Sequence, residues 1–351
     1  MNKKYIKNII FTKTPLLGKF RFKNEFQIYP LDLDNAPNST NTTHFPMIIE
    51  FWVDEDEIPK VTEFDSINVN NWIAQNTAQT NKLILITNLL SSISNYRFFF
   101  YRTPDVSWSI PLPEKVNGQT DEEINSTSCK WSASLYYYPS IAKDLQIDNF
   151  SNPKFDEVLF LNHKLYYWYD PVESKTKSIN FPDTTNSILE KYFSLDKEAL
   201  KIMNSAIYQF CNGLDLHHKM KSLSFFSIVS SIETLVNYEF RKEEIEFACD
   251  FCKSIKKSER VCSKCGKPTW GITAKFREFL FKYVSDDPKA KKMYNKIYDL
   301  RSKIAHTDYL INNENFLNWN FSDKTEELSL RHLEAIQLSR RSIVNWLLKN
   351  E

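Results

Sequence analysis

The chain has 351 residues, of which 42% are hydrophobic and 25% charged, a balance typical of a folded globular protein with about two domains. Its net charge is +1, and it contains only five glycines. Neither a P-loop nor a dinucleotide-binding fingerprint can be assembled, because each needs clustered glycines. The first twenty residues do not have the pattern of a secretory signal, and the run LILITNLL (83–90) is far shorter than a membrane span. We therefore expect a cytoplasmic protein with no membrane partner.

Residues 1–185 are predicted to form a β-rich domain. Four short runs of β-branched and aromatic residues are typical of strands and lie at 47–53, 82–87, 96–102 and 157–169. The last run predicts a hairpin that turns near residues 162–163. No catalytic constellation is evident in this half, so we expect a sensor domain or a substrate-selecting domain.

Residues 186–351 are predicted to form an all-α helical bundle, because the apolar period changes to that of helices. Five helices are expected, at 194–216, 221–240, 271–284, 289–305 and 326–350. The second is apolar on two sides, which predicts a central and nearly buried helix. The predicted fold class is therefore α+β, with a β-rich domain followed by a helical bundle.

A cysteine cluster lies between the second and third predicted helices, within residues 249–265. Its two C-x-x-C pairs are Cys249 with Cys252 and Cys262 with Cys265. Four thiolates complete the tetrahedral shell of a zinc ion, and disulfides are the weaker explanation in a reducing cytoplasm. Chance spacing and redox use are the alternatives. Because a shell of four protein ligands leaves no position for water, we expect the zinc to be structural and to take no part in catalysis.

Positive charge is concentrated between Arg241 and His306. This segment has seventeen Lys and Arg against nine Asp and Glu, a net charge of +8, whereas the remainder of the chain has a net charge of −7. Such a segment favours a polyanionic partner, and a solvated lysine-rich surface is the alternative interpretation.

The fourth predicted helix contains Arg301 and Ser302, and His306 follows directly after its apolar pattern ends. In an unbroken helix, five residues correspond to about 7.5 Å of rise and about 140° of rotation, so Arg301 and His306 would point apart. A helix that loosens after Ile304 would let His306 turn back towards Arg301. The alternative is a surface arginine and a histidine that complements the helix dipole.

Glu233 lies on the predicted buried helix, on the same face as Phe226, Val229 and Val236. A carboxylate on such a face needs a partner, and Arg301 is a candidate. A glutamate at the edge of the core that reaches solvent is the alternative.

The arrangement R-x4-H on a late helix of a bundle, here RSKIAH (301–306), resembles the R-x4-6-H motif of HEPN domains. The surrounding YDLRSKIAH (298–306) and the upstream SIETLVN (231–237) resemble the Apea-like HEPN family more specifically. The resemblance covers roughly residues 190–351. Family members often have Asn or Asp after the arginine, where this chain has Ser302.

The resemblance implies a metal-independent endoribonuclease that acts as a homodimer, often as a toxin-like effector in abortive infection against phage. RNA, with tRNA among the candidates, would be the substrate, and a phage-derived trigger would act on the N-terminal domain. The expected catalytic residues are Arg301, Ser302, His306 and Glu233.

These residue types suit the chemistry of RNA cleavage. RNA supplies its own nucleophile, the 2′-OH, so the protein needs a proton shuttle such as histidine and a fixed cation such as arginine for the charge on phosphorus. One histidine cannot easily serve as both acid and base, which favours a site shared by two protomers. The alternatives are a non-catalytic nucleic-acid-binding or antitoxin-like HEPN module, and a zinc-ribbon DNA-binding regulator.

Overall fold

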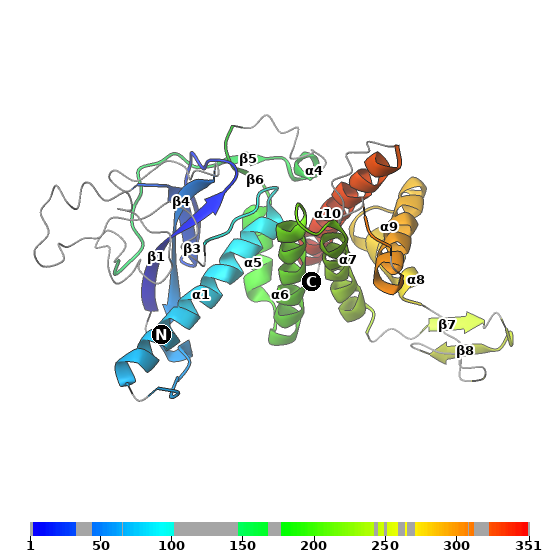
Figure 1. Cartoon of the computed structure of the whole chain (residues 1–351), viewed down its shortest axis with the longest axis horizontal. Coiled ribbons are helices and arrows are strands. Elements are labelled where there is room, and N and C mark those ends of the chain that lie inside the picture. Colours follow the sequence, from blue (N-terminus) through cyan, green and yellow to red (C-terminus); the bar gives the residue numbers. More distant parts are fainter. Residues whose placement is uncertain are drawn as a thin grey trace, which may run out of the picture. The chain divides into compact units, whose positions relative to one another are not determined.

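The computed structural model describes most of the chain. The described residues are 3–32, 44–64, 66–101, 147–167, 177–241, 245–248, 251–258, 264, 271–307, 309–311 and 323–349. The chain divides into two compact units, Met1–Asn186 and Ser187–Glu351. The first unit contains an antiparallel sheet and the second is mainly helical (Figure 1), which confirms the predicted α+β class. Within the described ranges, every helix is too short or too polar to cross a membrane.

A four-stranded antiparallel sheet forms the core of the first unit. Its strands are β1 (Lys3–Thr12), β2 (Phe20–Phe22), β3 (Phe26–Pro30) and β4 (Phe45–Asp54), in the order β1-β4-β3-β2. The prediction of a strand at 47–53 is confirmed by β4. This strand is buried on both faces from Pro46 to Phe51, which explains its nearly continuous apolar sequence.

Glu50 of β4 is fully buried and joins the sheet to a distant segment of the same unit. Its carboxylate accepts hydrogen bonds from Gln27 Nε2 at 2.6 Å, from Tyr29 Oη at 2.6 Å and from the backbone N–H of Ser151 at 2.8 Å. Burial, followed by the hydrogen bond to Glu50, raises the pKa of Tyr29. Since each donor satisfies part of the buried carboxyl group, the network offsets the cost of burying this polar side chain in the core.

The predicted strand at 82–87 is wrong, because these residues belong to helix α1 (Ile67–Ile93). Leu83, Ile86, Leu90 and Ile93 are all fully buried, and their spacing of three and four residues is that of one helix face. The polar residues interrupting this apolar run are accommodated within the helix, where Thr87 Oγ1 donates to the carbonyl of Leu83 at 2.8 Å. The helical period is visible only over a window longer than six residues.

The strand predicted at 96–102 fails, and the hairpin predicted within 157–169 is correct only in one short strand. Residues 102 and 168–169 of these runs lie outside the described part of the chain. The run 96–102 contributes one isolated bridge, in which Phe99 pairs with Phe11 of β1. The hairpin predicted within 157–169 is replaced by β5 (Leu159–Leu161), which pairs in parallel with β6 (Asn180–Pro182), and by the short helix α4 (His163–Tyr166). The side chain of Asn162 accepts a hydrogen bond from the N–H of Lys164 and caps this helix, so the polar residues mark a helix start where a turn was predicted.

The second unit is a bundle of helices. They are α5 (Thr185–Ser194, which begins in the first unit), α6 (Lys197–Leu216), α7 (Lys221–Glu239), α8 (Ile272–Tyr283), α9 (Pro288–His306) and α10 (Asp323–Lys349). The five predicted helices are confirmed by α6 to α10, and α5 was not predicted. The side chain of Asp196 caps α6 by accepting from the N–H of Ala199 at 2.8 Å. Helix α7 is nearly buried, as predicted, and contacts α6, α8, α9 and α10.

Close packing of α6 against α7 depends on Gly213. A Cβ atom at this position would lie 2.4 Å from Cγ1 of Ile228, which is closer than carbon atoms can approach. Ser224 of α7 uses the space by donating its hydroxyl to the carbonyl of Gly213 at 2.6 Å. The glycine therefore fixes the distance between the two helices.

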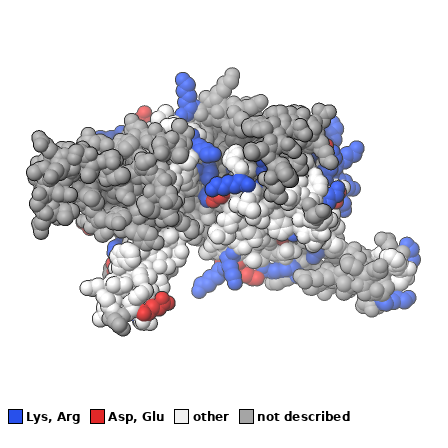
Figure 2. All heavy atoms as spheres, in the orientation of Figure 1, with Lys and Arg blue, Asp and Glu red and all other residues white. Residues whose placement is uncertain are grey.

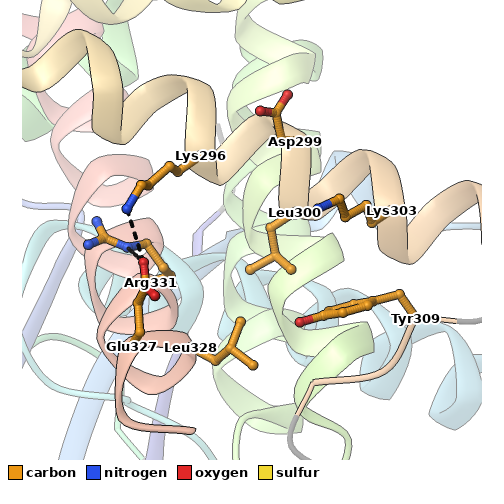
Figure 3. Close-up of a pocket in the computed structure, with 8 residues that line it drawn as sticks. All are labelled: Lys296, Asp299, Leu300, Lys303, Tyr309, Glu327, Leu328 and Arg331. Carbon is orange, nitrogen blue, oxygen red and sulfur yellow. Dashed lines mark hydrogen bonds and ion pairs between the residues drawn. The ribbon is translucent and has the colours of Figure 1, made fainter. Parts of the chain in front are cut away.

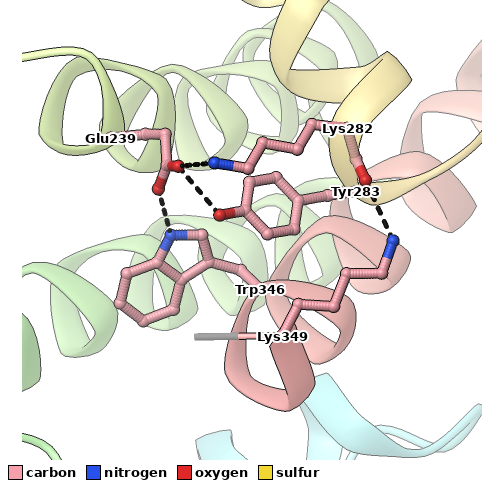
Figure 4. Close-up of polar contacts among 5 residues, drawn as sticks. All are labelled: Glu239, Lys282, Tyr283, Trp346 and Lys349. Carbon is pink, nitrogen blue, oxygen red and sulfur yellow. Dashed lines mark hydrogen bonds and ion pairs between the residues drawn. The ribbon is translucent and has the colours of Figure 1, made fainter. Parts of the chain in front are cut away.

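The end of α7 is anchored by Glu239 (Figure 4). Its carboxylate accepts hydrogen bonds from Lys282 Nζ at 2.6 Å, Tyr283 Oη at 2.9 Å and Trp346 Nε1 at 3.0 Å. Burial alone would raise the pKa of Glu239, but the three donors outweigh it and the pKa is lowered. The carboxylate joins α7 to both α8 and α10.

Candidate active site

Arg301 of α9 lies between two side chains of α7. Its Nη2 and Nε atoms donate to Oε2 of Glu233 at 2.7 and 3.1 Å, and its guanidinium carbon lies 4.8 Å from the centre of the Phe226 ring. Phe226 and Glu233 are seven residues apart and so lie on one face of α7. The side chains of Arg301 and Glu233 are 18% and 11% exposed. The guanidinium is thus held by a carboxylate and an aromatic ring.

Arg301, the candidate partner named for Glu233, forms this ion pair with it. Burial raises the pKa of Glu233, whereas the charge and hydrogen bonds of Arg301 and hydrogen bonds from Tyr298 and Ser230 oppose the rise. The sequence interpretation did not assign Tyr298 to the site. Its position three residues before Arg301 places it on the same face of α9, and this spacing could have identified it.

His306 is the last residue of α9 and is exposed. Of the two possibilities for this helix end, the structure has the unbroken one, because α9 stays helical to His306 and the N–H of Thr307 donates to the carbonyl of Lys303 at 2.9 Å. Five residues of continuous helix turn by about 140°. The structure therefore brings Arg301 and Glu233 together but does not bring His306 to them within one chain. Ser302 follows Arg301 on α9 and is half-buried.

The exposed stripe of α9 includes His306 together with Asp299 and Lys303. These residues have i, i+4 and i+7 spacing, which places them on one side of the helix. Tyr298 and Arg301 lie on the side that faces α7. On helix α9, Arg301 therefore faces α7, whereas His306 faces solvent.

A pocket of about 260 Å³ lies beside the exposed stripe, between α9, the first part of α10 and Tyr309 (Figure 3). It is lined by Lys296, Asp299, Leu300, Lys303, Tyr309, Glu327, Leu328 and Arg331. Lys296 Nζ lies 3.0 Å from Glu327 Oε1, and Arg331 Nε lies 4.0 Å from the same oxygen. The sequence interpretation missed this pocket, because its residues come from three separated segments.

The basic segment predicted between Arg241 and His306 includes several exposed lysines on α9. They are Lys289, Lys291, Lys292, Lys296 and Lys303. Lys and Arg side chains are visible in several places over the face of the molecule drawn in Figure 2. The exposed lysines are available to an anionic partner.

His332 of α10, unlike His306, is buried and is only 2% exposed. Its Nε2 lies 2.9 Å from Ser224 Oγ, and its ring centre lies 4.6 Å from that of His217. Burial, with smaller contributions from the charges of His217, Lys221 and His218, lowers the pKa of His332 to about 3. His332 is therefore neutral at cellular pH and suited to packing.

Only one of the four predicted zinc ligands lies in the described part of the chain. Cys252 lies in the connection between β7 (Ile245–Ala248) and β8 (Ile255–Ser258), with its Sγ 3.0 Å from Ser254 Oγ. Cys249, Cys262 and Cys265 lie outside the described residues. Among the side chains that are described, no group of three or more His, Cys, Asp or Glu could hold a metal ion. The zinc site stays a prediction.

No protein-family model matches the chain, and neither a curated protein nor a solved structure matches it significantly.

Proposed function

We propose that the chain is a metal-independent endoribonuclease of the HEPN type, with RNA as its substrate. The observation that supports this most is the fixed position of Arg301, which Glu233 and Phe226 hold on the helix that also carries His306. A guanidinium whose position is set before the substrate binds can stabilise charge on phosphorus without reorganising. Exposed lysines on the same helix would attract the polyanion.

The proposed reaction uses the 2′-OH of the RNA. His306 accepts the proton of this hydroxyl, the 2′-oxygen forms a bond to the adjacent phosphorus, and the bond from phosphorus to the 5′-oxygen breaks. Arg301 stabilises the negative charge on the phosphorane oxygens. A second histidine donates a proton to the leaving 5′-oxygen, so the products are a 2′,3′-cyclic phosphate and a 5′-hydroxyl. Positioned proton transfer of this kind contributes about 10²- to 10⁴-fold to the rate.

The geometry of α9 favours a site shared by two copies of the chain. Arg301 and His306 point in different directions on one continuous helix, and each chain supplies one His306. A homodimer would bring two such histidines together as acid and base. Glu233 is then a positioning residue for Arg301, and Ser302 offers a hydroxyl beside it.

The proposed zinc ion has a structural role. Cys252 lies in a short connection between paired strands, and such a hairpin suits one half of a knuckle formed with Cys249, Cys262 and Cys265. Purified protein should then contain about one zinc per chain, and Cys262→Ser should lose the metal and destabilise the helical unit. Protein that binds no zinc would contradict this part of the proposal.

The proposed biological role is that of a cytoplasmic, toxin-like effector in abortive infection, with the first unit as the part that senses a phage-derived trigger. A second candidate is a non-catalytic nucleic-acid-binding or antitoxin-like module. One observation favours it: Arg301 and His306 are turned about 140° apart on the continuous helix α9, so they do not form a catalytic pair within one chain.

Expression of wild type, Arg301→Ala and His306→Ala separates these candidates. We expect wild type to slow growth and to cleave RNA in vitro, and both variants to lose the two effects. The control is Lys201→Ala, which removes an exposed cation from α6, outside the basic segment. Identical growth of all four strains, with no cleavage by any of them, would contradict the enzymatic proposal.

The cleavage products test the mechanism separately. In EDTA, activity should persist and the ends should carry 2′,3′-cyclic phosphates or the 3′-phosphates derived from them, because the attacking oxygen belongs to the RNA. Activity that stops in EDTA, returns with magnesium and leaves 3′-hydroxyl ends would instead indicate a metal-dependent nuclease.

Mixing experiments test the shared site. Adding excess His306→Ala protein to wild type should lower activity below that expected from dilution, because mixed dimers form. A strictly proportional loss would indicate that one chain is sufficient.

A further inference from the structure

We infer that the pocket between α9, α10 and Tyr309 binds one unpaired base of an RNA strand, with Lys303 contacting the adjoining phosphate. This inference rests on the proposed function, because it specifies the form in which the RNA is bound. The pocket volume, about 260 Å³, is slightly below the range of about 300–1,000 Å³ that is usual for small-molecule sites. The pocket therefore suits a single ring system better than a larger ligand.

The walls of the pocket offer apolar surfaces to a flat ring. In Figure 3 the side chains of Leu300 and Leu328 and the ring of Tyr309 point towards one another. Leu300 is 7% exposed and is part of the core packing of α9, so this wall is firmly held. A base that stacks on a tyrosine and contacts leucine methyl groups is a common way of binding single-stranded nucleic acid, because every base has an aromatic face.

The charges around the pocket divide into two groups. Lys296 and Arg331 both pair with Glu327, and Arg331 also pairs with Glu334. These cations are therefore largely neutralised, by Glu327 in the pocket wall and by Glu334 outside it, and Asp299 adds a further carboxylate to the wall. Lys303 is exposed, and the ion pairs found among the described residues do not include it. Lys303 is therefore the cation that a phosphate can reach at the mouth of the pocket.

The position of Lys303 connects the pocket to the proposed chemistry. Lys303 and His306 are three residues apart on α9 and share its exposed stripe. A strand whose base lies against Tyr309 and whose phosphate lies at Lys303 would continue towards His306. The pocket would then set the register of the RNA at the cleavage site. A base within a duplex cannot enter it, because it is stacked and paired.

Binding of a labelled single-stranded oligoadenylate of about twelve nucleotides to the full-length protein tests the inference, with fluorescence anisotropy as the measurement. All proteins carry His306→Ala so that the probe is not cleaved. Tyr309→Ala should weaken binding by about 5- to 100-fold, as expected for loss of one stacked base. Tyr309→Phe keeps the aromatic face and should bind within about twofold of the parent.

The lysine is tested by charge-matched variants. Lys303→Gln should weaken binding and reduce the slope of log K against log salt by about one, whereas Lys201→Gln on α6, outside the basic segment, should do neither. Both residues are exposed, so these variants test the inference even if Tyr309→Ala fails to fold. Equal effects of the two glutamine variants would overturn the assignment of the phosphate contact.

Other outcomes separate this inference from the proposed function. Equal binding by Tyr309→Ala and Tyr309→Phe would overturn the base pocket, and so would a duplex that binds as tightly as the single strand. If His306-dependent cleavage is unchanged by Tyr309→Ala, the ribonuclease stands and the pocket inference falls. If binding depends on Tyr309 but wild type cleaves no RNA, the pocket stands and the ribonuclease falls.

Discussion

Glu233 and Glu239 lie six residues apart on α7, yet their environments shift their pKa values in opposite directions. Burial dominates at Glu233 and raises its pKa, with Arg301 as the main opposing group. At Glu239 the donors Lys282, Trp346 and Tyr283 outweigh burial and lower the pKa. Glu239 accepts hydrogen bonds from α8 and α10 and so anchors the end of α7. Arg301 is the largest group that opposes the burial of Glu233, so the position of Arg301 and the charge of Glu233 depend on each other.

The largest expected effect is that of breaking the Arg301–Glu233 pair. Arg301→Met should lower the free energy of unfolding by about 3 kcal/mol at neutral pH, because it leaves a buried carboxylate without its cation. The double variant Arg301→Met/Glu233→Gln should recover much of this loss. Chemical denaturation measures both values, and equal stability of the single and double variants would contradict the dependence of Glu233 on Arg301.

A smaller loss of unfolding free energy is expected on substitution of Glu239. Glu239→Gln should lower the free energy of unfolding by about 1–2 kcal/mol. The loss is moderate because an amide oxygen can still accept from Tyr283 or Trp346, and the half-exposed Lys282 can be solvated. The control is Glu327→Gln, which breaks an ion pair at the surface and should leave the thermal midpoint unchanged. A loss as large as that of Arg301→Met would remove the distinction between the two carboxylates.

The aromatic contact of Arg301 should contribute less again. Phe226→Leu removes the ring that contacts the guanidinium and should lower the free energy of unfolding by about 0.5–1 kcal/mol. Phe226→Tyr keeps the aromatic ring and serves as the control. If RNA cleavage depends on a fixed Arg301, Phe226→Leu should also lower the rate of RNA cleavage under conditions where the variant is still fully folded. Unchanged activity in Phe226→Leu would show that Glu233 alone holds the arginine.

The smallest effect is a change in the pH dependence of stability below neutral pH. The lowered pKa of Glu239 makes the unfolded state bind more protons, so its contribution is lost as pH falls below the ordinary value of 4.5. The raised pKa of Glu233 has the opposite sign, because its burial penalty is relieved as pH falls. Relative to wild type, Glu239→Gln should flatten the acid limb and Glu233→Gln should steepen it. Changes of the same sign would contradict the assignment.

The helical unit was largely predictable because its helices are long and strongly periodic. The pattern of α7 alone identified a buried helix and indicated that Glu233 needed a partner. The strand predicted at 82–87 failed because the five β-branched and apolar residues after Lys82 do not distinguish a strand from part of α1. Only the wider spacing from Leu83 to Ile93 shows the helix.

The candidate site was predictable only where it lies on one helix or on a pair of packed helices. Arg301 and Glu233 could be paired from the apolar pattern of α7. The pocket could not be found in this way, because Tyr309 and Leu328 come to Leu300 through tertiary packing. The helix predicted at 289–305 agrees with α9 to within one residue at each end, but the polar residues after Ile304 gave no apolar period that could show whether its last turn stays regular.

The close packing of α6 against α7, where Ser224 donates to the carbonyl of Gly213, has a consequence for the order of folding. Four residues connect α6 to α7, so this helix pair forms at a low cost of loop closure. Helix α10 joins through contacts between distant residues, such as Ser339 with Ser231 at 3.1 Å and Trp346 with Glu239. We expect the α6–α7 hairpin to be structured in the transition state and α10 to dock later. The pocket formed by α9 and α10 would then be among the last features of the bundle to appear on refolding.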